Sequence, residues 1–185
     1  MAYIRSLRTK DKGLLEQLEE KYLSSGVPMP GRLGNAYRLS ALIELRVARI
    51  YERMVRRFDE NPLVSAFFQK LQEEEQEHAR VMVLCLYTVD AQTELDYVPS
   101  VRDPEMRALL GELRAKALGV WKLSLDEALD LTEKLEASEV NTIFDKLLKQ
   151  TRNPKSDFFI SQLAKVEGHA AAVPKRIKAL REKLA

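Results

Sequence analysis

Cysteine is almost absent from this sequence of 185 residues, which contains only Cys85. A single cysteine cannot form an internal disulfide, and it cannot supply the paired thiolates of a zinc or rubredoxin-type iron site. A disulfide framework is therefore excluded, and we expect a protein suited to the reducing cytoplasm. Cys85 itself is expected to be a small core residue.

The sequence also lacks a marked charge imbalance and any long apolar run. Thirty basic residues against 28 acidic ones leave a net charge of +2, so bulk charge gives no reason to expect a nucleic-acid or membrane partner. No run approaches the ~20 apolar residues of a membrane span. The basic first residues lack the apolar core of a signal peptide. We therefore expect a cytoplasmic protein without nucleic-acid or membrane partners.

Prolines and glycines are few, and their positions divide the chain. All seven prolines and most of the seven glycines fall between long segments of helical periodicity, and no segment shows sustained period-two alternation with β-branched residues. The sequence therefore predicts one all-α domain. It would comprise an N-terminal appendage with a short helix (1–35), a first helix pair (36–90), a crossover (91–123) and a second helix pair (124–185).

The first helix pair carries charged groups on its apolar stripes. A helix over 36–58 places Glu44 on the apolar side, and the helix opened by Asn61–Pro62 places Glu75 and His78 there. The apolar members of the stripes are Ile43, Val47, Tyr51, Met54 and Phe58 in the first helix and Val64, Phe67, Leu71 and Met82 in the second.

Two other features of the first helix have an ordinary interpretation. The arginines lie largely off the stripe and should form a solvated face; they are Arg46, Arg49, Arg53, Arg56 and Arg57. The basic tail 175–183 has the same interpretation. Tyr51 is either a packing residue or a hydrogen-bond donor near the acidic group.

The second helix pair repeats the first. After a lesser helix over 106–118, a capping box at Ser124 opens a third helix, whose buried stripe includes Leu129, Thr132, Glu136, Val140, Ile143 and Leu147. Asn153–Pro154 opens a fourth helix. An offset of 92 residues carries Glu44 to Glu136 and Glu75 to Glu167, which indicates two similar antiparallel helix pairs.

The buried acidic residues predict a metal site. Glu75 and His78 are three residues apart, so their side chains leave one face of the helix. Burying an unpaired carboxylate costs several kcal/mol, and a divalent metal ion would offset this cost. Carboxylate oxygen with imidazole nitrogen suits iron or manganese, and zinc can also bind. The alternatives are an exposed acidic turn at Glu75 and His78, or buried Glu–Arg pairs.

The order of these residues resembles the ferritin-like superfamily, specifically rubrerythrin-like proteins without a rubredoxin domain. The resemblance covers roughly 36–172, and it implies a four-helix bundle with a long crossover connection. In that family each half gives one Glu and one Glu-x-x-His to a pair of irons. The metal ligands implied here are Glu44, Glu75, His78, Glu136, Glu167 and His169.

The fourth helix departs from the family pattern, because only one residue separates Glu167 from His169. Side chains two residues apart in a regular helix point away from each other, so both cannot face one site without a π-bulge or kink. Pro174 could supply such a distortion, or it could equally kink only an outer segment. His169 is either a ligand or an ordinary exposed or core histidine. The repeat offset favours Glu167 as the residue that faces the site.

The resemblance also implies a function. We expect one or two iron ions per chain, with manganese or zinc as alternatives, and an oxidoreductase that acts on peroxide or dioxygen. Since the chain has no rubredoxin-like cysteine set, its electrons must come from an external donor. A second copy of the chain is the other candidate partner. The rival hypothesis is a non-enzymatic helical scaffold that retains a degenerate metal site.

Overall fold

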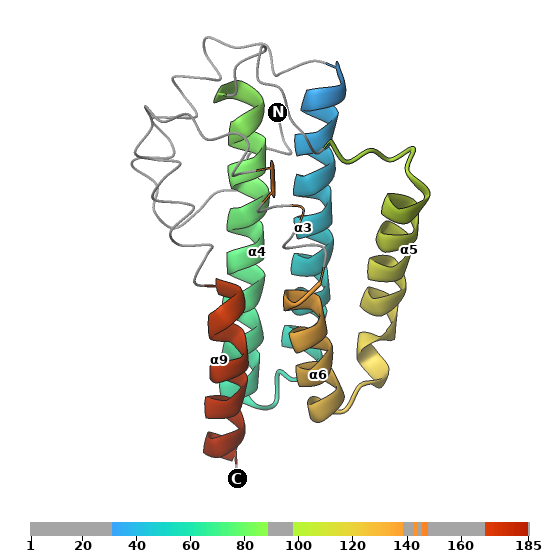
Figure 1. Cartoon of the computed structure of the whole chain (residues 1–185). Coiled ribbons are helices and arrows are strands. Elements are labelled where there is room, and N and C mark those ends of the chain that lie inside the picture. The colour runs from blue at the N-terminus through green and yellow to red at the C-terminus, as the bar shows by residue number, and fades with distance from the viewer. Residues whose placement is uncertain (1–30, 89–97, 139–142, 144–145, 148–168, 185) are drawn as a thin grey trace.

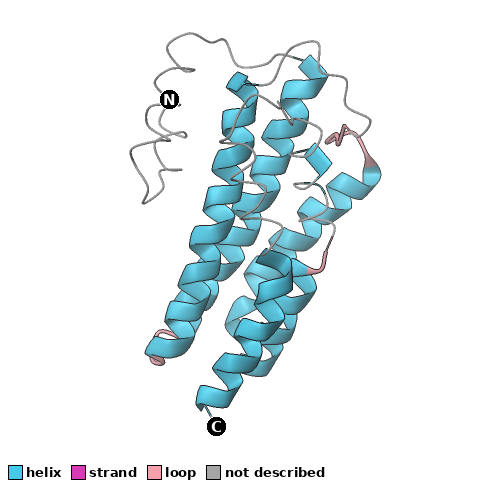
Figure 2. Cartoon of the chain, turned by 60° about the vertical axis from the view of Figure 1, so that its left-hand side comes forward, coloured by secondary structure: helices cyan, strands magenta, loops and turns pink. Residues whose placement is uncertain are grey.

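The computed structural model describes residues 31–88, 98–138, 143, 146–147 and 169–184. Within these residues all regular secondary structure is helical, which confirms the predicted all-α class (Figure 2). None of the described helices is both long and apolar enough to cross a membrane. The predicted N-terminal helix and the beginning of the fourth helix at Asn153–Pro154 lie outside the described residues.

Two long helices, α3 (Gly31–Arg57) and α4 (Pro62–Thr88), run side by side in opposite directions (Figure 1). The predicted start of α4 is confirmed, because Asn61 Oδ1 accepts hydrogen bonds from the backbone N–H groups of Leu63 (3.1 Å) and Val64 (3.3 Å). Helix α3 begins at Gly31 rather than at residue 36. Gly31 has a φ of 74°, which glycine adopts without strain.

The predicted apolar stripes form the interface between these two helices, and most of their members are fully buried. Phe58 and Phe67 are the two exceptions, since both are partly buried and pack against the core. Phe67 is only partly buried, while its neighbour Phe68 is fully buried and packs on Phe58 with ring centroids 5.7 Å apart. Phe68 lies three residues before Leu71 and therefore on the same helix face.

Helix α5 (Pro104–Gly119) lies beside α3 and continues into a short 3₁₀ segment, η1 (Val120–Lys122). Arg46 donates to the carbonyl of Leu110, and Arg53 donates to that of Ala117 at 2.7 Å. Both pairs are 64 residues apart in sequence, so the two helices run in the same direction with a constant register. A solvated face was therefore the wrong prediction for these two arginines, although Arg49, Arg56 and Arg57 are exposed.

Helix α6 (Leu125–Glu136) begins with the predicted capping box between Ser124 and Glu127. The prediction that this helix continues to residue 147 was wrong, because α6 ends at Glu136. The Ser138 hydroxyl donates to the carbonyl of Leu135 at 2.6 Å, and such a local bond competes with continuation of the helix. Ile143 and Leu147 are buried, as their place on the stripe predicted.

Helix α9 (His169–Leu184) lies along the lower part of α4, next to α6 (Figure 1). Two of its basic residues form ion pairs instead of a purely solvated face. Arg176 donates to Glu74 of α4 at 2.8 Å, and Arg181 donates to Asp130 of α6 at 3.0 Å. Pro174 lies within the helix. The tail therefore ties α9 to both neighbouring helices.

Candidate metal centre

Glu44 and Glu75 occupy the central positions of α3 and α4, two helices of 27 residues each. Because the turn between the helices is short, residues equally far from it lie at the same level of an antiparallel pair. The spacing between the two glutamates therefore places them opposite each other. Their side chains are fully buried, with 0% and 1% exposure.

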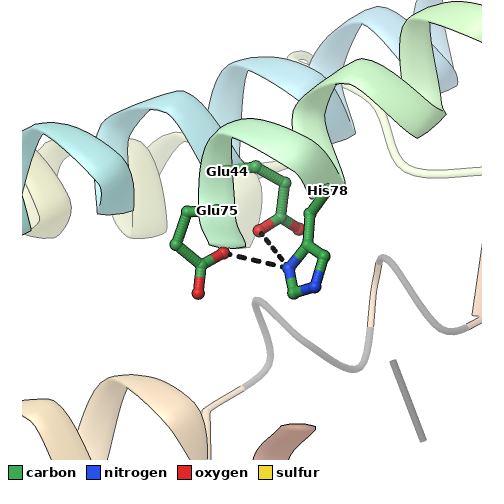
Figure 3. Close-up of side chains that lie close together, drawn as sticks. All are labelled: Glu44, Glu75 and His78. Carbon is green, nitrogen blue, oxygen red and sulfur yellow. Dashed lines mark hydrogen bonds and ion pairs between the residues drawn. The ribbon is translucent and has the colours of Figure 1, made fainter. Parts of the chain in front are cut away.

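His78 completes a group of three on the same side of the helix pair. Its Nδ1 lies 3.1 Å from Glu75 Oε2 and 3.9 Å from Glu44 Oε2, and one ligand atom from each residue falls within 4.8 Å of the others. Figure 3 shows the three side chains pointing toward one another, Glu44 from α3 and the other two from α4. The exposed-turn alternative is therefore wrong, since His78 is only 6% exposed.

The spacing of these atoms fits a metal ion. With metal–ligand bonds of about 2.1 Å, adjacent ligands of an octahedral ion lie about 3.0 Å apart and opposite ones about 4.2 Å apart. The two measured distances of 3.1 and 3.9 Å fall within that range. Two carboxylates and one imidazole also form an accepted ligand set for first-row metals. A buried group of Glu44, Glu75 and His78 could thus hold a metal ion.

Burial and nearby acidic groups affect the ionisation of Tyr51, which lies on α3 seven residues beyond Glu44. Burial itself, followed by the charges of Glu136 and Glu75, raises the pKa of Tyr51 well above its ordinary value. The phenol is fully buried. A cation at the centre would interact favourably with these acidic groups.

Glu136 is buried, as predicted, but it is not part of the three-residue group. Its Oε1 accepts a hydrogen bond of 2.7 Å from the hydroxyl of Tyr51. Both interpretations of Tyr51 therefore hold, because its ring packs in the buried core and its hydroxyl makes a hydrogen bond. The bond connects α3 with the last residue of α6, so it also fixes the position of Glu136 relative to the centre.

The remaining predicted ligands lie where the structure gives no side chain. Glu167 and the side chain of His169 are outside the described residues, although the backbone of His169 begins α9. The question of which residue faces the site thus stays a prediction.

Three further polar residues are buried, and each lies within seven residues of a member of the group along the chain. The sequence pattern did not identify them. Tyr37 precedes Glu44 by the same seven residues by which Tyr51 follows it, and Ser40 lies one turn before Glu44. Their common helix phase could have identified both. Arg80 is 2% exposed, and its place off the α4 stripe gave no signal.

No protein-family model, curated protein or solved structure matches this chain. The resemblance to ferritin-like proteins therefore depends on the residues alone. What the structure adds is the convergence of Glu44, Glu75 and His78 in one buried group.

Proposed function

We propose that this protein binds a divalent metal ion, iron before manganese or zinc, through Glu44, Glu75 and His78. The observation that carries the proposal is the burial of two carboxylates and one imidazole at separations that suit ligands of a single ion. Two acidic groups and one imidazole converge here, and a divalent cation would complement this set of ligand atoms.

The donor set favours iron or manganese over zinc. Carboxylate oxygen is a hard ligand, and its combination with imidazole is typical of ions that accept five or six ligands. Zinc sites more often close with four ligands that include thiolate. The only cysteine, Cys85, is buried seven residues beyond His78 and lies outside the group.

The wider architecture we propose is a ferritin-like four-helix bundle with a long crossover, in which the second helix pair supplies further ligands. Glu136 and either Glu167 or His169 would hold a second ion. Bound iron would supply redox chemistry toward peroxide or dioxygen, with electrons from an external donor. The residues of this chain would hold and orient the ion, and the apolar stripes would keep bulk water from it.

A non-enzymatic scaffold is the second candidate, and one contact favours it. Glu136, the expected ligand from the third helix, accepts the hydroxyl proton of Tyr51 and does not join the group. A carboxylate held in this way is less available to a second ion. One metal ion without turnover is the outcome that this candidate predicts.

The test is anaerobic titration of the metal-free protein with ferrous, manganous and zinc ions, followed by elemental analysis. We expect at least one tight ion per chain in the parent and loss of that ion in His78→Ala. Glu60→Gln removes an exposed carboxylate from the turn between α3 and α4 and serves as the control, with unchanged metal content. Equal metal content in His78→Ala and the parent would overturn the proposed site.

If the parent binds iron, the rate of ferrous oxidation by peroxide separates the two candidates. Catalysed oxidation with repeated turnover supports the oxidoreductase. Tight iron that is oxidised no faster than iron in buffer supports the scaffold.

A further inference from the structure

Ser40, on α3, is a buried polar residue without a hydrogen bond. Its side chain is 0% exposed, and its hydroxyl oxygen has no hydrogen-bond partner among the described residues. Removal of a hydroxyl from water is unfavourable unless a new bond compensates for it. Most buried hydroxyls in proteins are bonded, so an exception calls for a physical reason.

Thr132 shows how a buried hydroxyl on a helix is ordinarily satisfied. It is also 0% exposed, and its hydroxyl donates to the carbonyl of Ala128, one turn earlier in α6, at 2.9 Å. Any serine or threonine within a helix has this acceptor within reach. Ser40 does not form this bond with the preceding turn of α3. Its hydroxyl is therefore available to a partner outside its own helix.

The position of Ser40 places that hydroxyl beside the metal centre. Ser40 lies one turn before Glu44, and residues four apart on a helix are neighbours on one face. Helical side chains lean toward the N-terminus, so the side chain of Glu44 lies over the turn that contains Ser40. Ser40 and Ala79 are equally far from the turn between α3 and α4, which puts Ser40 at the level of the residue after His78.

The ligand set of the centre is incomplete on this side. The group of described residues supplies three ligand atoms, whereas first-row divalent ions accept four to six. Glu136 does not join the group and accepts a hydrogen bond from Tyr51, which follows Glu44 by seven residues. Ser40 precedes Glu44, so it lies toward the other end of α3 from Tyr51. A ligand next to Ser40 would thus come from outside the chain.

We propose that the Ser40 hydroxyl donates a hydrogen bond to a small anion that binds to the metal ion at this centre. The inference rests on the proposed function and specifies a ligand for it. Two carboxylates already balance the charge of a divalent ion, so charge alone attracts an anion only weakly. A hydroxyl donor adds to this attraction, because hydrogen bonds to charged acceptors are stronger than those to neutral ones.

The burial of the centre limits the size of the anion. Glu44, Glu75 and His78 are 0%, 1% and 6% exposed, and Figure 3 shows their side chains pointing toward one another. An anion that touches both the ion and the Ser40 hydroxyl must fit among these buried side chains. The ligand class is therefore that of hydroxide, hydroperoxide or azide, and azide is a suitable probe.

Titration of the cobalt-loaded full-length protein with azide tests the proposal. Cobalt(II) binds to the same kind of nitrogen and oxygen ligands, and its visible absorption reports changes in coordination. We expect the parent to bind azide saturably. Ser40→Ala should keep the cobalt content of the parent but bind azide about tenfold more weakly, because it loses one charge-assisted bond. Ser40→Thr keeps a hydroxyl and should bind azide within about threefold of the parent.

Thr132→Val is the matched control, since it removes a buried hydroxyl that already has its own acceptor. It should leave cobalt content and azide affinity unchanged within about twofold. Three results would overturn the proposal. They are equal azide affinity in the parent and Ser40→Ala, equal weakening in Thr132→Val, and no azide binding by the cobalt-loaded parent.

Cobalt content separates this inference from the proposed function. A parent that takes up no cobalt overturns both, whereas full cobalt content with unaltered azide affinity in Ser40→Ala overturns the inference alone. Loss of cobalt from Ser40→Ala also overturns the inference, because Ser40 would then hold the ion and not its ligand.

Thermal melting of the metal-free proteins tests the state of the hydroxyl directly. Ser40→Ala should melt about 2–4 °C higher than the parent, since it removes a buried hydroxyl that lacks a partner. A lower melting temperature would show that the hydroxyl is bonded within the fold and would overturn the proposal.

Discussion

The two faces of α3 use charged residues in opposite ways. On one face Glu44 is fully buried against α4, where its side chain lies close to those of Glu75 and His78. On the other face Arg46 and Arg53 are half-buried, and each donates to a backbone carbonyl of α5. Each of these two arginines thus has a backbone acceptor, whereas Glu44, Glu75 and His78 form a buried group that could hold a metal ion.

This difference helps to distinguish buried charged residues that support the fold from those that could bind a ligand. A guanidinium can extend its long side chain so that its apolar stem packs while its head reaches an acceptor. The short side chains of two buried carboxylates cannot reach solvent in this way, and together with His78 they form a group that could hold a metal ion. Each face can therefore be tested by a change that removes its charge and leaves the other face intact.

The largest effect is expected at the acidic face. Glu44→Gln removes one negative charge and one anionic ligand, and we expect the affinity for ferrous or zinc ion to fall by at least about 100-fold, or about 2.7 kcal/mol. Arg46→Gln, on the opposite face, should leave metal affinity unchanged within twofold. Competition with a chromogenic chelator measures both. Equal losses in the two variants would show that the effect reflects general destabilisation and not loss of a ligand.

A smaller effect distinguishes Glu44 from its repeat counterpart. If Glu44 and Glu136 were equivalent, as the 92-residue repeat indicates, removal of either glutamate should stabilise the metal-free protein, because each change would relieve buried negative charge. The bond from Tyr51 reverses this expectation for Glu136. Glu136→Ala leaves a buried hydroxyl without its acceptor and should cost about 2 kcal/mol of unfolding free energy in the absence of metal.

Denaturant unfolding of the metal-free proteins provides the measurement, and Tyr51→Phe provides the control. The double change Glu136→Ala with Tyr51→Phe should recover part of the loss, since neither polar group then remains. If Glu136→Ala alone stabilises the protein, the hydrogen bond does not hold this carboxylate in solution.

Much of the first helix pair could be predicted from the sequence, because its signals are local and strong. The apolar period, the Asn61–Pro62 start and the common face of Glu75 and His78 each depend on neighbours within a few residues. The stripe included the partly buried Phe67 but not its fully buried neighbour Phe68, because both residues lie within one turn of Leu71 on the same face.

The features that could not be predicted depend on contacts between residues distant in sequence or on local bonds that end a helix. No local pattern shows that Arg46 and Arg53 would meet carbonyls 64 residues away. The end of α6 after Glu136 depends on a serine hydroxyl that bonds back to the helix, and the repeat concealed it by suggesting continuity. Likewise, the repeat indicated that Glu136 is buried, but it did not show that Tyr51 would donate a hydrogen bond to it.

The arginine face should respond more weakly than the acidic core. Arg53→Met keeps much of the apolar stem but loses the bond to Ala117, and we expect a loss of about 1.5 kcal/mol in unfolding free energy. Arg49→Met, on the same helix but exposed, should change it by less than about 0.5 kcal/mol. Chemical unfolding followed by circular dichroism checks both. An equal effect of the two changes would mean that the α5 contact adds nothing.

The smallest expected effect lies at the start of α6, far from both faces of α3. Hydrogen bonds from the backbone N–H and the hydroxyl of Ser124 lower the pKa of Glu127, and the Glu127 N–H in turn donates to the Ser124 hydroxyl. Because the pKa of Glu127 is lower in the folded protein than in the unfolded chain, its ionised form stabilises the fold above the unfolded pKa of about 4.3. This stabilisation is lost as the pH falls through the folded pKa. The parent should therefore be more stable than Glu127→Gln near neutral pH, and this difference in stability should disappear in acid.

Thermal melting from pH 7 to pH 3 measures the difference. The control is Ser124→Ala, which loses the cap itself at a cost of about 1 kcal/mol and should be destabilised at every pH. A parent advantage that grows on acidification would show that Glu127 is repelled in the folded state and would contradict the capping box as the source of its charge preference.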